Sequence, residues 1–296
     1  MGNLIKAEMR KIVTTKSWWA LLIPAFFASL LFALGWGAFT NSLANVLDSE
    51  DTLTVTRTLG IETGELPMGL LAIGHGINVG LLFAVILGVL AVAGEYSKKT
   101  ITTTFLTAPN RPMALGAKMI TYSIWGALYG LAVSAAASLG IAFVVDGARM
   151  PSSGQWLAVI GTSLLAGVLA TLFGVGVGAL WKSVAGSVVT LSIYMLLIEN
   201  VWVFISYGLW QENVAWMGGV LPNGTLNGIV GAIGAEAFGA AGVRIPGLQD
   251  EAVWGLQFSA GAPGAFSWWA SALIFFGWTM VVFVGGWLVN QKRDIT

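Results

Sequence analysis

Long runs of apolar residues dominate the pattern along the chain. Six runs reach the roughly 20 residues that a helix needs to cross the hydrocarbon core of a bilayer. They lie at about residues 17–39, 68–93, 114–145, 156–181, 184–209 and 267–290. Charged residues, tryptophans or turn-forming residues bound each run, as expected at membrane interfaces. The pattern predicts an all-α polytopic membrane protein with six transmembrane helices.

Residues 1–16, before the first run, form a short amphipathic segment. On a helical wheel one half carries the apolar side chains and the other carries the basic ones, which predicts a helix lying at the inner membrane surface. Glu8 falls inside the apolar half, so we expect it to pair with a cation on a neighbouring segment; the alternative is a frayed tail with a solvated Glu8. The first apolar run is longer than the core of a signal peptide, so it is read as an uncleaved span.

A weakly apolar run at residues 225–243 makes the number of spans ambiguous. It contains Glu236 and many glycines but few large apolar side chains. A seventh span there would place Lys292 and Arg293 outside. We therefore expect a re-entrant or surface helix at the outer face, within a long outer segment at 210–266 between spans five and six.

Composition narrows the class further. Charged residues make up only 9% of the chain, against about 25% in soluble domains. With a formal net charge of zero, most of the surface cannot face water. This excludes a soluble enzyme, a nucleic-acid-binding protein and a disordered protein. The chain has no Cys and a single His, His75, so it has neither a disulfide framework nor a Cys-ligated or His-rich metal site.

The basic residues set the expected orientation. With the N-terminus inside, eleven basic residues are cytoplasmic and only Arg57, Arg149 and Arg244 are outside. The eleven are Lys6, Arg10, Lys11, Lys16, Lys98, Lys99, Arg111, Lys118, Lys182, Lys292 and Arg293. This asymmetry predicts that both termini are cytoplasmic in a multi-pass protein of the cell membrane. The acids show the opposite bias, because ten of the 14 fall outside.

Glycine pairs four residues apart recur inside the spans. They are Gly76/Gly80, Gly126/Gly130 and Gly174/Gly178. This spacing lets helices approach closely. It is compatible either with a bundle whose helices slide or with ordinary membrane packing.

Enzymatic motifs are missing. The sequence contains no Gly-x-x-x-x-Gly-Lys-Ser/Thr phosphate loop and no His-Glu-x-x-His pair. His75 belongs to no motif with a nucleophile. The one clearly buried acid, Glu199, is weak support for an ion-coupled pump, since such carriers usually have several acids inside their spans. We expect no enzymatic activity and no cofactor in this chain itself.

The first inner loop, residues 94–113, carries the most informative pattern. Thr100 or the residues just before it can cap a short helix, and Pro109 disfavours helix at the residue before it. Ile101 and Phe105 are four residues apart and share one face, with Leu106 beside them. A short cytoplasmic helix with an exposed apolar face predicts a partner protein that receives it.

This loop resembles the first inner loop of type-2 ATP-binding-cassette (ABC) permeases. The likeness rests on Glu95, the Thr100-Ile101 start, Leu106, Pro109, Arg111 and Lys118. Three other segments resemble the family in the same order: residues 5–12 followed by 14–16, Pro222 after the fifth span, and the closing residues 292–295. The six-span plan covers the whole chain. The Gly- and Ala-rich stretch at 224–245 departs from the pattern of the family.

The resemblance implies one permease domain over residues 1–296, acting as the transmembrane subunit of an ABC exporter. Such a subunit pairs with a second copy or a paralogue, and with two separate ATPase subunits that bind ATP and Mg. Residues 100–108 would be the coupling helix that docks on the ATPase. Its expected docking residues are Thr100, Ile101, Thr104, Phe105, Leu106, Pro109 and Arg111. Glu95 would brace this loop against the N-terminal segment, through Glu8 and Arg10 or Lys11.

The expected substrate path is less specific. Glu199 lies about 15 residues along the fifth span, or roughly 22 Å from its inner end at 1.5 Å per residue. Asn200 is beside it, and His75 and Asn78 lie at the same depth in the second span. The resemblance implies that these two spans line the cavity, where an acid and amides would bind a cationic or peptide-like substrate. Alternatively, Glu199 is protonated and hydrogen-bonded to His75 or Asn78, or is wetted at the interface.

Two other functional classes remain open from the sequence. One is a stand-alone secondary carrier or channel, and the other is a membrane anchor of a regulatory complex. For an exporter, peptides, drugs and lipids are all compatible substrates. Membrane lipid is an expected partner in every case, and nucleic acid in none.

Overall fold

The computed structural model describes residues 1–50, 53, 63–101, 111–240 and 249–291, and every regular element within them is a helix. Six helical segments are long and apolar enough to cross a membrane. They are α2 (Ser17–Leu47), α4 (Met68–Ser97), most of α6 (Arg111–Ala142), α7 (Ser153–Trp181), the continuous run of α8 (Val184–Ile193), η3 (Tyr194–Ile198) and α9 (Glu199–Trp210), and most of α12 (Trp268–Gln291). The predicted all-α, multi-pass architecture is confirmed. The first span continues to Leu47, eight residues beyond its predicted end.

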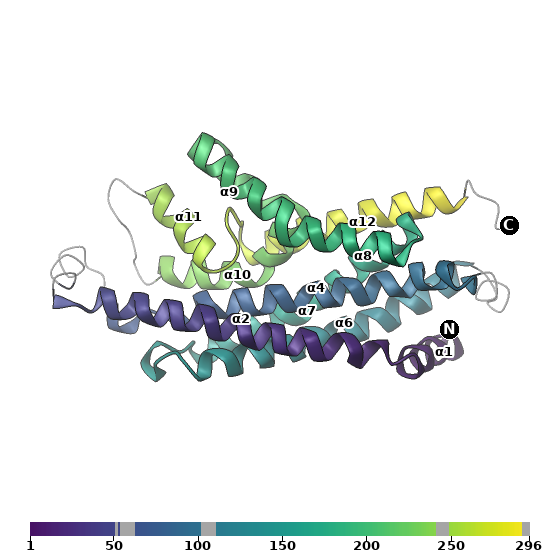
Figure 1. The fold of residues 1–296 in the computed structure, drawn as a ribbon, viewed down its shortest axis with the longest axis horizontal. Coiled ribbons are helices and arrows are strands. Elements are labelled where there is room, and N and C mark those ends of the chain that lie inside the picture. The colour runs from purple at the N-terminus through teal and green to yellow at the C-terminus, as the bar shows by residue number, and fades with distance from the viewer. Residues whose placement is uncertain (51–52, 54–62, 102–110, 241–248, 292–296) are drawn as a thin grey trace.

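The long helices run along the long axis of the molecule (Figure 1). The N-terminus, the turn between α7 and α8, and the C-terminal end of α12 lie at the same end of the bundle, which we call the α1 end. The opposite end, called the far end, holds the short 3₁₀ helices η1 (Thr63–Glu65) and η2 (Gly147–Arg149).

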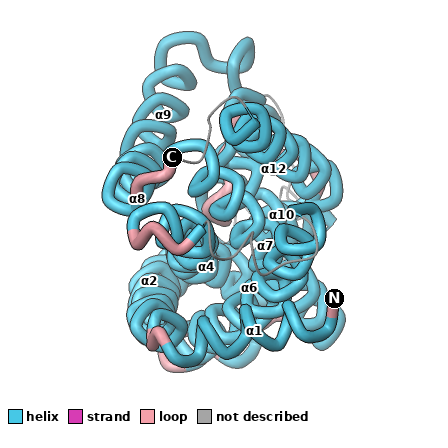
Figure 2. Tube along the Cα trace, turned by 90° about the vertical axis from the view of Figure 1, so that its right-hand side faces the viewer, coloured by secondary structure: helices cyan, strands magenta, loops and turns pink. Residues whose placement is uncertain are grey.

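Helix α1 (Gly2–Thr14) forms within the predicted segment 1–16. It lies across the ends of the long helices instead of continuing α2 (Figure 2). The turn at Thr15 and Lys16 breaks the chain between them, and Lys16 adopts a left-handed backbone with φ of 59°. Glu8 and Ile12 are the buried residues of α1, so the helix uses one face to pack on the bundle.

Helix α4 is the central element of the bundle. It packs against α2, α6, α7, α8 and α10 and is buried along most of its length, which explains why its sequence has no polar face. Glycines let it approach α7 closely. A methyl group at Gly88 would collide with the Thr171 carbonyl, and one at Gly174 would collide with the Val85 carbonyl. The predicted close helix packing at Gly174 is therefore present.

Between spans five and six the chain folds back into the bundle. The 3₁₀ helix η4 (Gln211–Gly219) leads to α10 (Pro222–Ala240), whose first turn lies beside Glu199 in the middle of the fifth span. Helix α10 packs against α4, α7 and α12 and is largely buried. Helix α11 (Gln249–Ser259) and a turn at 260–267 then lead to α12. The weakly apolar run at 225–243 is thus largely the buried helix α10.

Candidate functional site

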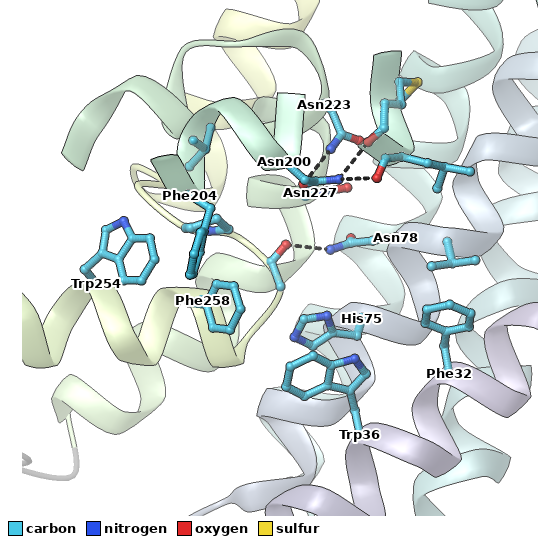
Figure 3. Close-up of a pocket in the computed structure, with 16 residues that line it drawn as sticks. Phe32, Trp36, His75, Asn78, Asn200, Phe204, Asn223, Asn227, Trp254 and Phe258 are labelled. Atoms are coloured by element: carbon cyan, nitrogen blue, oxygen red, sulfur yellow. Dashed lines mark hydrogen bonds between the residues drawn. The ribbon is translucent and has the colours of Figure 1, made fainter. Parts of the chain in front are cut away.

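A cavity of about 530 Å³ lies in the far half of the bundle, between α2, α4, the fifth span, α10 and α11. Aromatic side chains form much of its wall and asparagines supply its polar groups (Figure 3). The asparagines are Asn78, Asn200, Asn223 and Asn227, and the labelled aromatic groups are Phe32, Trp36, His75, Phe204, Trp254 and Phe258. Among the described residues no charged side chain lines it. The cavity therefore combines apolar surface with neutral hydrogen-bonding groups.

One wall of the cavity is held in place by α4. The rings of His75 and Trp36 stack with centroids 3.6 Å apart and planes 3° apart. On its other side His75 Nε2 is 3.1 Å from the Ser259 carbonyl oxygen, and Asn78 Nδ2 donates to the Gly261 carbonyl at 2.9 Å. Two adjacent turns of α4 thus bind the end of α11 and the turn that follows it.

Gly261 is required for this arrangement. Its φ of +78° lies in the left-handed region, which side chains other than glycine rarely adopt. A Cβ at this position would also lie 2.9 Å from Asn78 Nδ2 and 3.2 Å from His75 Nδ1. The sequence at residue 261 therefore fixes how closely the turn approaches α4.

The opposite wall is a set of aromatic rings from α11 and the fifth span. Trp254 stacks on Phe258 with centroids 5.5 Å apart, and on its other face stacks on Tyr207 at 3.8 Å. Phe258 also meets Trp36 edge to face at 6.3 Å. These contacts link α2, α9 and α11 around the cavity.

The fifth span contains a local π-helix, and two of its residues, Met195 and Leu196, line the cavity. Residues 194–198 form η3, in which the usual backbone hydrogen bonds are displaced by one residue. The Asn200 amide compensates by donating to the Met195 carbonyl at 2.8 Å and the Leu196 carbonyl at 3.2 Å. Asn200 Oδ1 also accepts a bond of 3.4 Å from Asn223 of α10.

Glu199 has a different environment from the one we expected. Its carboxylate accepts the backbone N–H of Asn223 at 2.9 Å and that of Gly224 at 2.5 Å, and Tyr194 hydrogen-bonds it as well. These N–H groups are unpaired donors at the start of α10, where the helix dipole is positive. Glu199 is 2% exposed and does not line the cavity. It fastens α10 to the fifth span and bonds neither His75 nor Asn78.

The structure thus brings His75, Asn78 and Asn200 of the predicted path to one cavity, with Glu199 outside it. Sequence reasoning missed the partners from α2, α10 and α11. Trp36 lies near the end of the first apolar run, where tryptophans are typical of the membrane interface, and Trp254 and Phe258 belong to a segment with no clear periodicity. Asn223 and Asn227 are four residues apart on α10, a spacing that could have indicated one polar helix face.

A second polar centre lies at the α1 end, where four charged residues meet. Lys118 Nζ of α6 is 2.9 Å from both Glu8 Oε2 and Glu95 Oε1. Lys11 Nζ contacts Glu95 Oε1 and lies 3.9 Å from Glu8 Oε1. We call these residues the charge cluster. It joins α1, the end of α4 and α6. The segment between α4 and α6, residues 98–110, is called the 98–110 loop below.

Within the charge cluster the two lysines differ in burial. The Lys118 side chain is 3% exposed, whereas that of Lys11 is 38% exposed. Burial, together with the charge of Lys118, lowers the pKa of Lys11 to about 8. Glu8 thus pairs with a cation from a neighbouring segment, and Lys11 contacts Glu95. Arg10 is exposed on α1 and is not part of the cluster, because it lies on the other face of the helix. Lys118, at the centre, was not singled out for this role.

The predicted docking helix is described only at its beginning. The Thr100 backbone N–H donates to the Glu95 carbonyl at 2.9 Å and its hydroxyl donates to the same oxygen at 3.5 Å, so Thr100 closes the end of α4. Ile101 is 6% exposed and does not offer an exposed apolar face. Thr104, Phe105, Leu106 and Pro109 lie outside the described residues, and Arg111 is described only as the first residue of α6.

The described part of the chain contains no group of three or more His, Cys, Asp or Glu residues placed to hold a metal ion. No protein-family model matches the chain, and no curated protein matches it significantly. The geometry of the cavity and of the charge cluster is therefore the basis for a functional proposal.

Proposed function

We propose that the chain is the transmembrane permease subunit of an ATP-driven ABC exporter, powered by separate ATPase subunits. The observation that carries the proposal is that one helix, α4, contributes to both polar centres. His75 and Asn78 line the cavity near one end of α4, and Glu95 belongs to the charge cluster near the other. The 20 residues from His75 to Glu95 span about 30 Å at 1.5 Å per residue. A buried helix of this length can transmit a movement at the inner loop to the cavity.

In the proposed orientation the α1 end faces the cytoplasm, following the excess of basic residues there. Helices α10 and α11 then form a re-entrant pair that enters from outside, with the first turn of α10 at mid-membrane depth beside Glu199. Backbone at this depth is tolerated where it is buried in protein or lines a cavity. The buried position of α10 and the carboxylate at its N-terminus support this arrangement.

Transport would proceed by alternating access. When two ATPases close on ATP, they would move the 98–110 loop, and the charge cluster would carry that movement to α1, α4 and α6. The permease needs only two packings that differ by a few kcal/mol, biased by the ATPase. The aromatic walls and amides of the cavity suit a ligand with an apolar body and a few hydrogen-bonding groups. Peptides, drugs and lipids all include such molecules.

The docking step is tested by a charge on the predicted apolar face of the loop. The tagged full chain would be purified with the ATPase with which it assembles in its own membrane, and Phe105→Asp would be compared with Thr103→Asp. In the helix predicted from the sequence, residue 103 would lie on the side opposite residues 101 and 105, so it is a matched control. We expect Phe105→Asp to lose the ATPase and Thr103→Asp to keep it. Retention of the ATPase and of ATP-driven transport by Phe105→Asp would contradict the proposal.

The same preparation separates the exporter from the other two classes. A stand-alone carrier or channel would move solute in vesicles that contain the chain without any ATPase. A membrane anchor would bind the ATPase, but no transported compound would stimulate ATP hydrolysis. The exporter proposal predicts ligand-stimulated hydrolysis that is lost when Trp36→Ala and Asn227→Ala are combined in the cavity.

A further inference from the structure

A second cavity, of about 260 Å³, lies at the α1 end of the bundle. It is bounded by α1, the start of α2, the end of α4, α6 and the first residue of α8. Leu90 and Tyr122 form apolar wall. The polar lining consists of Lys11, Lys98, Glu95, Thr15, Ser17, Ser97 and Thr100. This cavity is distinct from the one in the far half of the bundle, because the two share no lining residue.

The charges around this second cavity leave a net positive site. Lys11, Lys98 and Glu95 line it, and Lys118 Nζ lies 2.9 Å from Glu95 Oε1. The two acids, Glu8 and Glu95, are engaged by Lys118 and Lys11 within the charge cluster. Three cations against two anions make the surroundings of the cavity positive by one charge, which Lys98 carries at its rim.

Neutral donors add to the preference for an anion. The hydroxyls of Thr15 and Ser17 lie at the cavity edge, where they hydrogen-bond each other at 3.0 Å and Thr15 also donates to the Ile12 carbonyl at 3.1 Å, so an anion would have to compete for their protons. Val184 is the first residue of α8, so the positive end of that helix dipole faces the same space. Together with the lysines, these groups resemble the donor set that binds phosphoryl oxygens in proteins.

At the α1 end, lysines occupy turn positions whose left-handed backbone glycine would adopt with less strain. Among the described residues, three that are not glycine have positive φ, and all are lysines at the α1 end: Lys16, Lys99 and Lys182, with φ of 59°, 56° and 59°. A left-handed conformation costs a side chain of this kind roughly 1–2 kcal/mol. The sequence therefore keeps cations at these turns despite their conformational cost.

We propose that the second cavity binds the phosphate of an anionic phospholipid from the leaflet at the α1 end. Basic pockets between transmembrane helices on this side of a membrane are suited to such headgroups. The outer surface of α8 continues from the cavity with exposed apolar side chains, including Val189 and Ile193, which are 55% and 47% exposed. An acyl chain can lie there while its headgroup occupies the cavity, which favours a lipid over a soluble phosphate ion.

A glycine in the cavity wall allows a sharp test. Gly94 lines the cavity and a Cβ there meets no atom within 4 Å, so we expect Gly94→Leu to occupy part of the cavity. Gly161 of α7 is equally unobstructed and lines neither cavity, so Gly161→Leu is the matched control. The full chain would be reconstituted in vesicles of three parts phosphatidylcholine to one part phosphatidylglycerol, extracted in detergent, and examined by native mass spectrometry. We expect the wild type and Gly161→Leu to retain phosphatidylglycerol selectively and Gly94→Leu to lose it.

A second pair of variants tests the charge without filling the cavity. Lys98→Gln should weaken phosphatidylglycerol retention about fivefold, which corresponds to about 1 kcal/mol for one basic residue at an anionic surface. Lys99→Gln removes the same charge from a residue that does not line the cavity and should have a smaller effect. Equal retention of both lipids by the wild type, or unchanged selectivity in both Gly94→Leu and Lys98→Gln, would overturn the proposal. Displacement of phosphatidylglycerol by millimolar inorganic phosphate would assign the site to a soluble anion and overturn the lipid assignment.

Discussion

Two buried acids fasten peripheral helices to the central spans, and they do so with different partners. At the α1 end Glu95 meets the side-chain cations Lys118 and Lys11, which hold α1 and α6 to the end of α4. In the middle of the bundle Glu199 meets two backbone N–H groups at the start of α10. Loss of a cation at the first site leaves a buried charge unpaired, whereas loss of the carboxylate at the second leaves neutral donors. This difference determines how strongly each site should respond to mutation.

Lys118→Met should have the largest effect on stability. It removes the buried cation that lies 2.9 Å from both Glu8 and Glu95 and leaves these acids only the partly exposed Lys11. Breaking a buried ion pair from one side typically costs about 3–5 kcal/mol. Thermal unfolding in detergent would measure the loss. The triple variant Glu8→Gln, Glu95→Gln and Lys118→Met should recover much of it, because no buried acid is left unpaired and the remaining Lys11 is partly exposed. A triple variant as unstable as Lys118→Met would show that charge pairing is not the cause.

Glu199→Leu should have a smaller effect, confined to α10. The carboxylate makes two bonds to backbone N–H groups. Its loss leaves neutral donors unpaired, which costs less free energy than leaving a buried charge unpaired. Hydrogen exchange at Asn223 and Gly224 should rise strongly in Glu199→Leu. Glu199→Gln keeps one acceptor oxygen and should lie between it and the wild type. Unchanged exchange at these two amides in Glu199→Leu would refute the role of Glu199 in fastening α10.

Gly261→Ala tests whether the turn that follows α11 must approach α4 closely to form the cavity wall. The substitution places a methyl group 2.9 Å from Asn78 Nδ2 on a backbone with φ of +78°, and such strain costs about 1–3 kcal/mol. We expect lower stability together with weaker ligand stimulation of ATP hydrolysis. Gly255→Ala, in the same region and with no atom near its Cβ, is the control. If both variants behave alike, the Gly261 turn does not shape the cavity.

Lys11→Met should have the smallest effect, despite removing the same charge as Lys118→Met. Lys11 is partly exposed, and exposed ion pairs contribute about 0–1 kcal/mol. Glu95 also keeps its bond to Lys118 in this variant. Thermal unfolding should give Lys11→Met a free energy of unfolding within about 1 kcal/mol of the wild type. That result would support the difference in burial between Lys11 and Lys118. A loss as large as that of Lys118→Met would contradict the difference in burial.

The lowered pKa of Lys11 predicts how its contribution to the free energy of unfolding changes with pH. Its pKa is about 8 in the folded chain, against 10.5 ordinarily. Between these pH values the unfolded chain binds more protons than the folded one, so the Lys11 contribution to stability rises with pH. The stability difference between wild type and Lys11→Met should therefore shift in favour of the wild type from pH 8 to pH 10. A shift in the opposite direction would show that the ion contact with Glu95 outweighs the burial of Lys11.

The six spans were predictable because their signal is carried by consecutive residues. Each run is long and apolar enough to be read without knowledge of its neighbours. Helix α10 was harder, since glycines replace the large apolar residues that would indicate burial. Gly228 and Gly231 of α10 pack directly against Ser271 and Ala262, so smallness is what allows the helix to be buried. Hydropathy does not register that property.

The candidate site was only partly predictable for the same reason. His75, Asn78 and Asn200 were identified because polar residues within spans are rare. Trp254, Phe258 and the turn at Gly261 come from a segment far away in sequence, and only the folded chain brings them to α4. Glu199 was identified for the same rarity but assigned the wrong neighbours. Its partners are backbone groups, which side-chain patterns do not indicate.

In the proposed mechanism, α4 couples the inner loop to the cavity in the far half of the bundle. The chain has no Cys, so a single Asn227→Cys reports on the cavity without background. In the reconstituted complex, its labelling by a membrane-impermeant thiol reagent from the outer face would be measured with and without ATP. We expect ATP to change the labelling rate severalfold in the otherwise wild-type complex, and we expect Phe105→Asp to abolish this change. If the complex hydrolyses ATP but its labelling rate does not depend on ATP, α4 does not couple the inner loop to the cavity.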